Sequence, residues 1–174
     1  MALLAEELVE EWLNRQGFFT IRGIKIGVQE IDLLAVRQNG KVLECRHLEV
    51  QASVRPVSYI TKASKELQKS SGRSSASAKK RSDEELMDGV KEWVSKKFLL
   101  PVKRKLRDSL SSGPWTYELV LHRIKHPEEV KVIEKQGVKI HFLSQIVKEL
   151  QRHSKTNVIA AARGCDFVDL LELD

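Results

Sequence analysis

The spacing of hydrophobic residues along the chain alternates between the period of a helix and the period of a strand. Near the start, Leu4, Leu8 and Trp12 fall on one stripe, which predicts a helix over residues 2–16. In residues 28–36 apolar and polar side chains alternate, which predicts a strand that buries one face. We therefore expect a sheet that is covered by helices.

Hydrophobic periodicity, together with breaks at Gly, Pro and Asn, predicts five strands and five helices. Strands are expected at residues 18–24, 28–36, 41–51, 115–124 and 138–143. Helices are expected at residues 2–16, 57–69, 83–100, 127–135 and 144–153. Residues 158–162 fit either a strand or a helix, and residues 167–173 are an apolar closing segment. This order predicts an α/β fold in which helices flank a mixed sheet of about five strands.

The second and third predicted strands are joined at Asn39-Gly40, a strong signal for a hairpin because both residues tolerate a positive φ. A two-residue loop at this position sets the register of the two strands. In that register Asp32 faces His47 and lies diagonally across from Glu49, on the same face of the sheet. The hairpin is thus expected to bring two carboxylates together.

Paired carboxylates on adjacent strands are typical of a site for a hard divalent cation such as Mg²⁺, which prefers oxygen ligands. Asp32 and Glu49 can supply two such ligands, and Gln51 points to the same face because Val50 between them points into the core. A three-residue turn would invert the faces and put Glu44 in the place of Glu49. The choice of glutamate therefore depends on the register.

The tripeptide Glu49-Val50-Gln51 has the form of an E-x-K half-site in which glutamine replaces lysine. With an aspartate one strand earlier and an acidic helix before it, this half-site resembles the PD-(D/E)xK nuclease superfamily, which has a restriction endonuclease-like fold. The strand over residues 29–34 reads Gln-Glu-Ile-Asp-Leu-Leu. It is similar to the Gly-Glu-Ile-Asp-Leu-Ile strand of small bacterial members and to archaeal Holliday-junction resolvases. The resemblance covers about the first 52 residues closely and the later strand order loosely.

The resemblance implies roles for four residues. Asp32 and Glu49 would be ligands of Mg²⁺ or Mn²⁺, and Glu6, seven residues before Leu13, would assist through water on the metal. Gln51 departs from the family pattern, because an amide can orient the attacking water but cannot neutralise charge in the transition state. A lysine from the next predicted helix, at position 62 or 65, could supply that charge instead.

The charge distribution adds a candidate surface for nucleic acid. The formal net charge is +6, and the segment from residue 51 to 113 holds fifteen Lys and Arg against seven Asp and Glu. Such a basic segment suits the phosphate backbone of DNA, although a solvated helical face has the same composition. The candidate DNA contacts are Arg55, Lys62, Lys65, Lys69, Arg73, Lys79, Lys80 and Arg81.

These patterns predict one domain over residues 1–174, with a basic helical insertion at about 55–112. The first hypothesis is a metal-dependent endonuclease that hydrolyses DNA phosphodiester bonds. An alternative is a catalytically inactive nucleic-acid-binding module on a nuclease-like fold, which the glutamine at position 51 would favour. A third hypothesis is a protein-interaction subunit whose basic helices bind an acidic partner.

Composition narrows the setting in which the protein is expected to act. With 41% hydrophobic residues, two cysteines and no long apolar run, we expect a cytoplasmic protein that does not enter a membrane. The family resemblance also implies a possible homodimer.

Overall fold

The computed structural model describes residues 2–53 and 58–153. Arg55 and the two segments expected at residues 158–162 and 167–173 lie outside the described residues. Within the described residues, no helix is long and apolar enough to cross a membrane.

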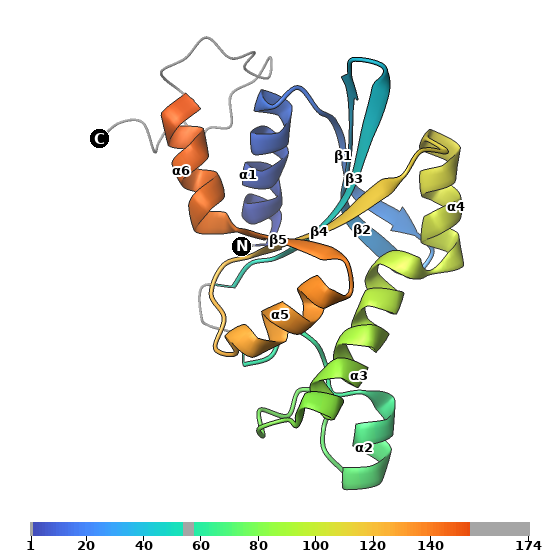
Figure 1. Ribbon diagram of the computed structural model, residues 1–174, viewed down its shortest axis with the longest axis vertical. Helices are drawn as coiled ribbons and strands as arrows, with labels where there is room; N and C mark the ends of the chain where they lie inside the picture. Colours follow the sequence, from blue (N-terminus) through green and yellow to red (C-terminus); the bar gives the residue numbers. More distant parts are fainter. Residues whose placement is uncertain (1, 54–57, 154–174) are drawn as a thin grey trace.

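A five-stranded mixed sheet forms the centre of the molecule (Figure 1). Its strands follow one another in chain order, and the first three are antiparallel while the last three are parallel. The α/β class with a mixed five-stranded sheet is thereby confirmed. The strands are β1 (Phe19–Ile26), β2 (Gln29–Asn39), β3 (Val42–Gln51), β4 (Trp115–Leu121) and β5 (Val138–Phe142).

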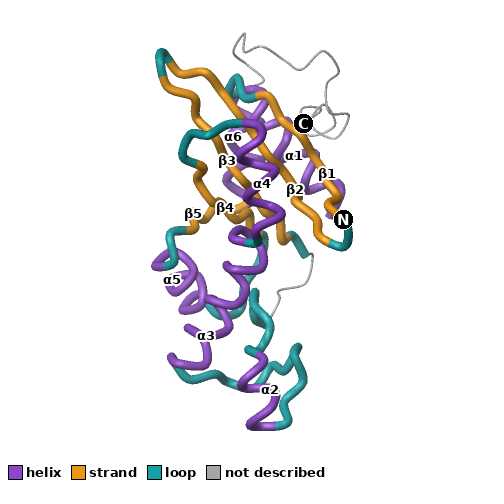
Figure 2. The backbone as a smooth tube through the Cα atoms, turned by 90° about the vertical axis from the view of Figure 1, so that its right-hand side faces the viewer, coloured by secondary structure: helices purple, strands orange, loops and turns teal. Residues whose placement is uncertain are grey.

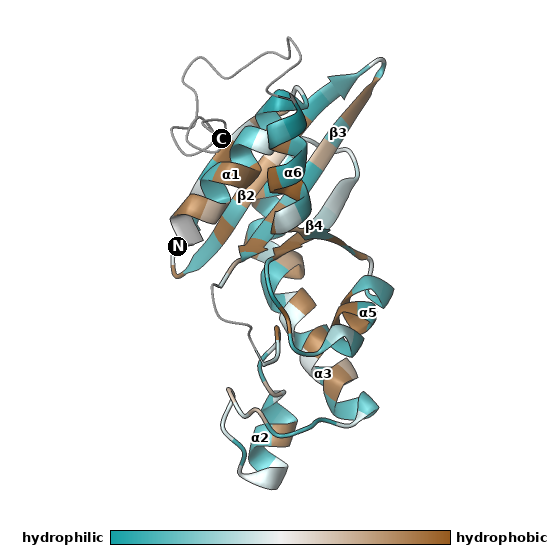
Figure 3. Ribbon diagram, turned by 90° about the vertical axis from the view of Figure 1, so that its left-hand side faces the viewer, coloured by the Kyte–Doolittle hydropathy of each residue, from teal (hydrophilic) through white to brown (hydrophobic). Residues whose placement is uncertain are grey.

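Helices cover both faces of this sheet, and each face has its own hydrophobic core. On one face α1 (Ala2–Arg15) and α6 (Leu143–His153) lie side by side (Figure 3). The other face carries α3 (Asp83–Val94), the π-helix η1 (Ser95–Leu99), α4 (Pro101–Leu110) and α5 (Pro127–Lys135). The short helix α2 (Lys65–Ser71) lies at the end of the molecule away from the sheet (Figure 2).

The hairpin between β2 and β3 turns at Gly40 and Lys41, because Asn39 pairs with Val42. Gly40 has a φ of 59°, and none of the described non-glycine residues has a positive φ. A single positive φ at the first central position fits a type II′ turn, whereas a type I′ turn at Asn39-Gly40 would need two. The predicted turn is therefore displaced by one position.

This displacement changes the partners of the acidic residues but not the face on which they lie. His47 pairs with Leu34, so the predicted pairing of His47 with Asp32 is wrong by two residues. A shift of two residues returns each side chain to its original face. Asp32 and Glu49 accordingly line one common cavity.

The helices between β3 and β4 differ from the predicted ones in two places. The helix expected over residues 57–69 begins only at Lys65, where the Ser64 side chain accepts a hydrogen bond from the Leu67 N–H at 3.2 Å. At the start of α3, Ser82 and Glu85 form a capping box, in which each side chain accepts a hydrogen bond from the backbone N–H of the other residue. The sequence predicts a helix that ends at residue 100 and no further helix before residue 115, whereas Pro101 opens the additional helix α4.

Helix α4 is amphipathic, but its basic face points toward the sheet and apolar residues point toward solvent. Its basic residues Lys103 and Arg107 point inward and are 1% and 2% exposed. Its apolar residues Val102 and Leu110 point outward and are 40% and 43% exposed. Charged side chains therefore hold α4 against the sheet, where Lys103 contacts Glu49 and Arg107 contacts His47.

Candidate active site

Strands β2 and β3 separate at the point where the two predicted acids lie. Their pairing ends at Leu33 and Leu48, whereas β2 continues along β1 and β3 continues along β4. Asp32 follows at this opening on β2, and its Oδ2 accepts a hydrogen bond from the backbone N–H of Val50 at 2.8 Å. The Asp32 carboxylate is thereby held beside β3.

Glu49 on β3 is 1% exposed and lies among donors from three elements, β3 itself, η1 and α4. Its Oε2 lies 2.5 Å from Nζ of Lys97 in η1, and its Oε1 lies 3.2 Å from Nζ of Lys103 in α4. Burial by itself would raise the pKa of Glu49, but His47 and the two lysines lower it overall. Glu49 is therefore a stable carboxylate within the protein.

His47 fixes the second oxygen of Glu49 and is itself oriented by α4. Its Nε2 lies 3.2 Å from Glu49 Oε1, and its Nδ1 lies 2.9 Å from a guanidinium nitrogen of Arg107. Because burial lowers the pKa of His47 to about 4, the ring is neutral at pH 7. Arginine can only donate, so Nδ1 accepts and Nε2 carries the proton that is donated to Glu49.

Asp32 has the opposite electrostatic balance. Burial and the neighbouring charge of Glu49 raise the pKa of Asp32 to about 7, and the hydrogen bond from Val50 offsets only part of this effect. The carboxyl group therefore holds its proton far more tightly than an exposed aspartate does. Additional positive charge at this point would favour the ionised form.

Glu6 of α1 belongs to the same electrostatic neighbourhood. Burial raises its pKa, Arg22 opposes the rise, and the charges of Glu30 and Glu49 add to it. The pKa of Asp32 is in turn raised slightly by Glu6. Glu6 does not line the cavity beside Asp32 and Glu49, and its coupling to these two acids is electrostatic.

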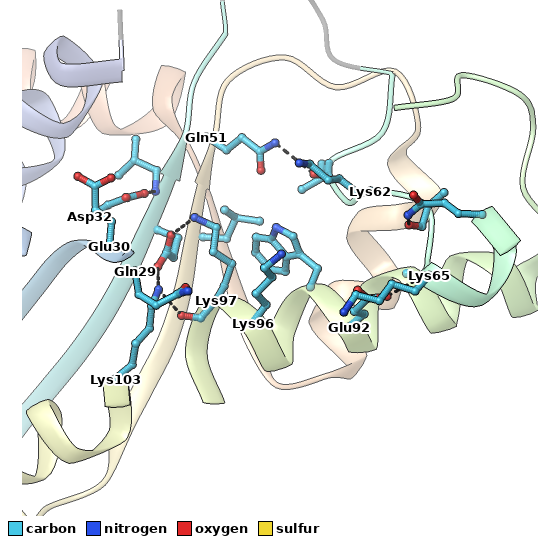
Figure 4. Close-up of a pocket in the computed structure, with 18 residues that line it drawn as sticks. Gln29, Glu30, Asp32, Gln51, Lys62, Lys65, Glu92, Lys96, Lys97 and Lys103 are labelled. Carbon is cyan, nitrogen blue, oxygen red and sulfur yellow. Dashed lines mark hydrogen bonds and ion pairs between the residues drawn. The ribbon is translucent and has the colours of Figure 1, made fainter. Parts of the chain in front are cut away.

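A cavity of about 560 Å³ opens next to Asp32 and Glu49 (Figure 4). Acidic groups lie at one end, and Lys65 and Glu92 lie at the other. The volume is in the range of pockets that bind small organic ligands, roughly 300–1,000 Å³. The remaining lining is supplied by Gln29, Glu30, Val50, Gln51, Ile60, Lys62, Ala63, Gln68, Gly89, Trp93, Lys96, Lys97, Lys103 and Leu119.

The far wall of the cavity is a loop that a buried carboxylate holds in place. Glu129 of α5 is fully buried and accepts hydrogen bonds from the N–H groups of Ile60 and Thr61 at 2.6 and 2.9 Å. Helix α3 approaches the same loop at Gly89, where a Cβ would lie 3.0 Å from the carbonyl oxygen of Lys62. The wall is therefore built with little free space behind it.

The lysines that contact Glu49 differ from the expected ones. Lys62 and Lys65 line the cavity, but Lys97 and Lys103 form the ion pairs with Glu49. Sequence reasoning missed them because they lie about fifty residues away on helices without a known motif. A usable signal was present, since Lys103 and Arg107 fall one helical turn apart on one face of α4.

The predicted basic contacts fall into two groups. Lys62, Lys65, Lys69, Lys79 and Lys80 are exposed. Arg73 is half-buried and forms an ion pair with Glu85 at 3.4 Å. Arg81 is wrong as a surface contact, because it is 6% exposed, donates to the Thr61 carbonyl at 3.1 Å and stacks over the Tyr59 ring.

Gln51 lies in the cavity lining, as expected, but its amide is partly committed. Its Nε2 donates to the carbonyl oxygen of Ile60 at 3.2 Å. The side-chain oxygen of Gln51 belongs to the same amide and can accept a hydrogen bond from a water or a ligand. Gln51 therefore connects the end of β3 to the loop that forms the far wall.

Asp32 and Glu49 fit a small divalent cation by the chemistry of their donors. Among the described residues, no group of three or more His, Cys, Asp or Glu is arranged to hold a metal ion. Mg²⁺, however, is usually held by one or two carboxylates with water and substrate oxygens in the remaining positions. The raised pKa of Asp32 is consistent with a site in which a further cation would be favourable.

The chain has a distant structural likeness to a protein of known structure. Neither the known protein families nor the curated proteins contain a match to this sequence. The crystal structure of AF1548, a protein of unknown function, has a similar chain path with a TM-score of 0.43 and 16% sequence identity. The likeness covers 81% of this chain and 59% of AF1548.

Proposed function

We propose that this protein is a metal-dependent endonuclease that hydrolyses phosphodiester bonds of DNA. The observation that carries the proposal is the pairing of Asp32 and Glu49 at one end of a lysine-lined cavity. A phosphodiester brings negative charge to the site, and the lysines of the lining offset that charge. The exposed lysines between residues 62 and 80 extend the basic surface along which a DNA backbone would lie.

In this proposal Asp32 and Glu49 hold Mg²⁺ or Mn²⁺ through one carboxylate each. The metal ion would act as a Lewis acid toward the phosphodiester. His47 keeps the Glu49 carboxylate in one orientation through its Nε2 proton. Lys97 supplies the positive charge that Gln51 cannot, because its ammonium group lies at the Glu49 carboxylate, which faces the cavity.

Cleavage assays on single-stranded, duplex and branched DNA with Mg²⁺ or Mn²⁺ test this function directly. We expect turnover that EDTA abolishes and that Asp32→Ala reduces at least about 100-fold, as expected for loss of a metal ligand. Glu44→Ala is the matched control, since Glu44 is a glutamate on β3 that pairs with Arg37 outside the cavity. Equal turnover in wild type and Asp32→Ala would refute the nuclease.

The role of Lys97 is tested by a second pair of variants. Lys97→Ala should lower turnover about 100-fold, because it removes a charged donor beside Glu49, at the acidic end of the cavity. Lys91→Ala removes an exposed lysine of the neighbouring helix α3 and serves as the control. If both variants lost turnover to the same extent, Lys97 would contribute only to the general electrostatic attraction of DNA and would have no specific role at the site.

A second candidate function is a nucleic-acid-binding module without catalysis. The observation that favours it is the commitment of Glu49 to Lys97, Lys103 and His47, which leaves few lone pairs for a metal ion. Calorimetric titration with Mn²⁺ separates the two functions. Salt-dependent DNA binding without Mn²⁺ affinity would select the module, and Mn²⁺ binding that is lost in Asp32→Ala would select the nuclease.

A further inference from the structure

The cavity differs along its length in a way that suits one kind of DNA. At its acidic end Glu49 is 1% exposed, Asp32 is half-buried and Glu30 is exposed. A phosphate that approaches Glu49 therefore enters a space of about 560 Å³ lined by the sheet, α3 and the 60–63 loop. A single nucleotide unit fits such a space, whereas the paired and stacked bases of a duplex must remain outside it.

An aromatic side chain lies on the path into the cavity. Trp93 of α3 lines the cavity and is only half-buried. Its ring meets Phe98 edge to face, with the centroids 5.7 Å apart, and this contact limits its movement. An indole held in this way provides a flat surface on which a base can stack, provided that the base is not already stacked within a duplex.

Cationic side chains line the same cavity as Trp93. Lys62, Lys65 and Lys96 line the cavity and are exposed. Among the described residues, no carboxylate lies within ion-pair distance of their ammonium groups. Lys96 follows Trp93 by three residues on the same helical run, so the two project from neighbouring positions. These lysines can hold phosphates on either side of a stacked base.

We propose that the cavity receives an unpaired DNA strand, with one base stacked on Trp93 and the adjoining phosphates held by Lys62, Lys65 and Lys96. The proposal rests on the proposed function only in taking nucleic acid as the ligand, and it holds equally for an inactive binding module. In this proposal the cavity selects unpaired DNA, and the exposed lysines outside the cavity attract any DNA through its phosphates.

Fluorescence anisotropy in EDTA at low salt measures this recognition without cleavage. The probes are labelled oligothymidylate of about 12 residues, a hairpin duplex of about 12 base pairs, and a strand of the same length made of abasic residues. We expect the single strand to bind at least about tenfold more tightly than the duplex and than the abasic strand. Equal or tighter binding of the duplex would overturn the proposal.

Substitutions at two tryptophans locate the effect. Trp93→Leu should weaken single-strand binding about tenfold and leave duplex binding unchanged, whereas Trp93→Phe should restore most of the affinity. Trp115→Leu is the matched control, because Trp115 is also half-buried but lies at the start of β4 outside the cavity. Equal losses in the two leucine variants would overturn the assignment, and circular dichroism confirms that each variant is folded.

The outcomes separate this inference from the proposed nuclease. Selective single-strand binding that depends on Trp93, without cleavage by any preparation, supports the inference and refutes the nuclease. Cleavage of duplex DNA that is indifferent to Trp93 supports the nuclease and overturns the inference. Should Trp93→Leu fail to fold, the comparison of Trp93→Phe and wild type on the intact and abasic strands decides, and equal affinity for both strands overturns the inference.

Discussion

Glu49 and Glu118 are buried glutamates on adjacent strands, and each lies beside a histidine, but they point to opposite faces of the sheet. Glu49 faces η1 and α4 and lines the cavity. Glu118 faces the α1 and α6 side, where its Oε2 lies 2.7 Å from His141 Nε2 and its Oε1 accepts from Thr116 Oγ1 at 3.1 Å. Arg46 completes this second cluster at 3.6 Å.

The two clusters share some properties and differ in others that bear on the proposed active site. Burial raises the pKa of both glutamates, and nearby donors and cations lower it overall in both. These properties therefore do not separate them. The difference lies in Asp32, a second acid whose pKa is raised to about 7, and in the cavity that opens beside it.

The largest predicted difference between the two clusters is in turnover. Glu49→Gln should reduce DNA cleavage at least about 100-fold, since a neutral amide is a poor ligand for Mg²⁺. Glu118→Gln should change the rate less than about twofold at a temperature where it is folded, because it lies on the other face of the sheet. Initial rates on one labelled substrate measure both variants. Comparable losses in the two would remove the distinction.

The order reverses for stability. Glu118→Gln should lower the free energy of unfolding by about 3 kcal/mol at pH 7, because it leaves Arg46 and His141 without their buried partner. The lowered pKa of Glu118 means that its contribution is present above the unfolded pKa of about 4.3 and is lost as the pH falls through the folded pKa. Urea denaturation should therefore show the difference between variant and wild type shrinking with acid. A difference that is constant with pH would contradict the ionic origin.

Asp32 should behave in the opposite way. Its pKa is higher in the folded chain than in the unfolded chain, so the metal-free protein loses stability as the pH rises from about 4 to about 7. Asp32→Asn keeps an acceptor for the Val50 N–H and removes the charge. We expect it to raise the free energy of unfolding by about 1–2 kcal/mol at pH 8 in EDTA and to have no effect near pH 4. A destabilised variant at pH 8 would show that the acid supports the fold.

The position of Asp32 beside Glu49 could be predicted from the sequence even though the turn could not. The alternation of apolar and polar residues in β2 and β3 assigns each side chain to a face, and an error of two residues in register preserves that assignment. The turn was displaced because Asn39-Gly40 suggests a type I′ loop, whereas only Gly40 of this pair has a positive φ.

The cationic half of the site could not be predicted in the same way. Lys97 and Lys103 reach Glu49 across about fifty residues of sequence, and no local pattern encodes that contact. Helix α4 also contradicts the rule that the apolar face of a helix points inward, because Val102 is exposed while Lys103 is buried. Only the three-dimensional contacts show that a buried glutamate attracts the basic face.

The smallest predicted effect concerns the turn that sets the register of the two acids. Gly40→Ala should lower the free energy of unfolding by about 1 kcal/mol, because its φ of 59° is strained for any residue with a Cβ. Lys41→Ala in the same turn should have almost no effect. Thermal denaturation measures both, and both variants should keep the turnover of the wild type. A loss of turnover in Gly40→Ala would mean that the hairpin contributes more than its register.

Because α4 is attached to the sheet by charged residues, its attachment depends on the surrounding ions more than that of the helices held by apolar packing. Lys103 and Arg107 fasten the helix through Glu49 and His47, whereas α1 and α6 are fastened by apolar packing. Glu49 is thus both a proposed metal ligand and a residue that attaches α4 to the sheet. A cation that binds the Glu49 oxygens, whether from the buffer or from a neighbouring side chain, therefore also weakens the contact between Lys103 and Glu49 that attaches α4.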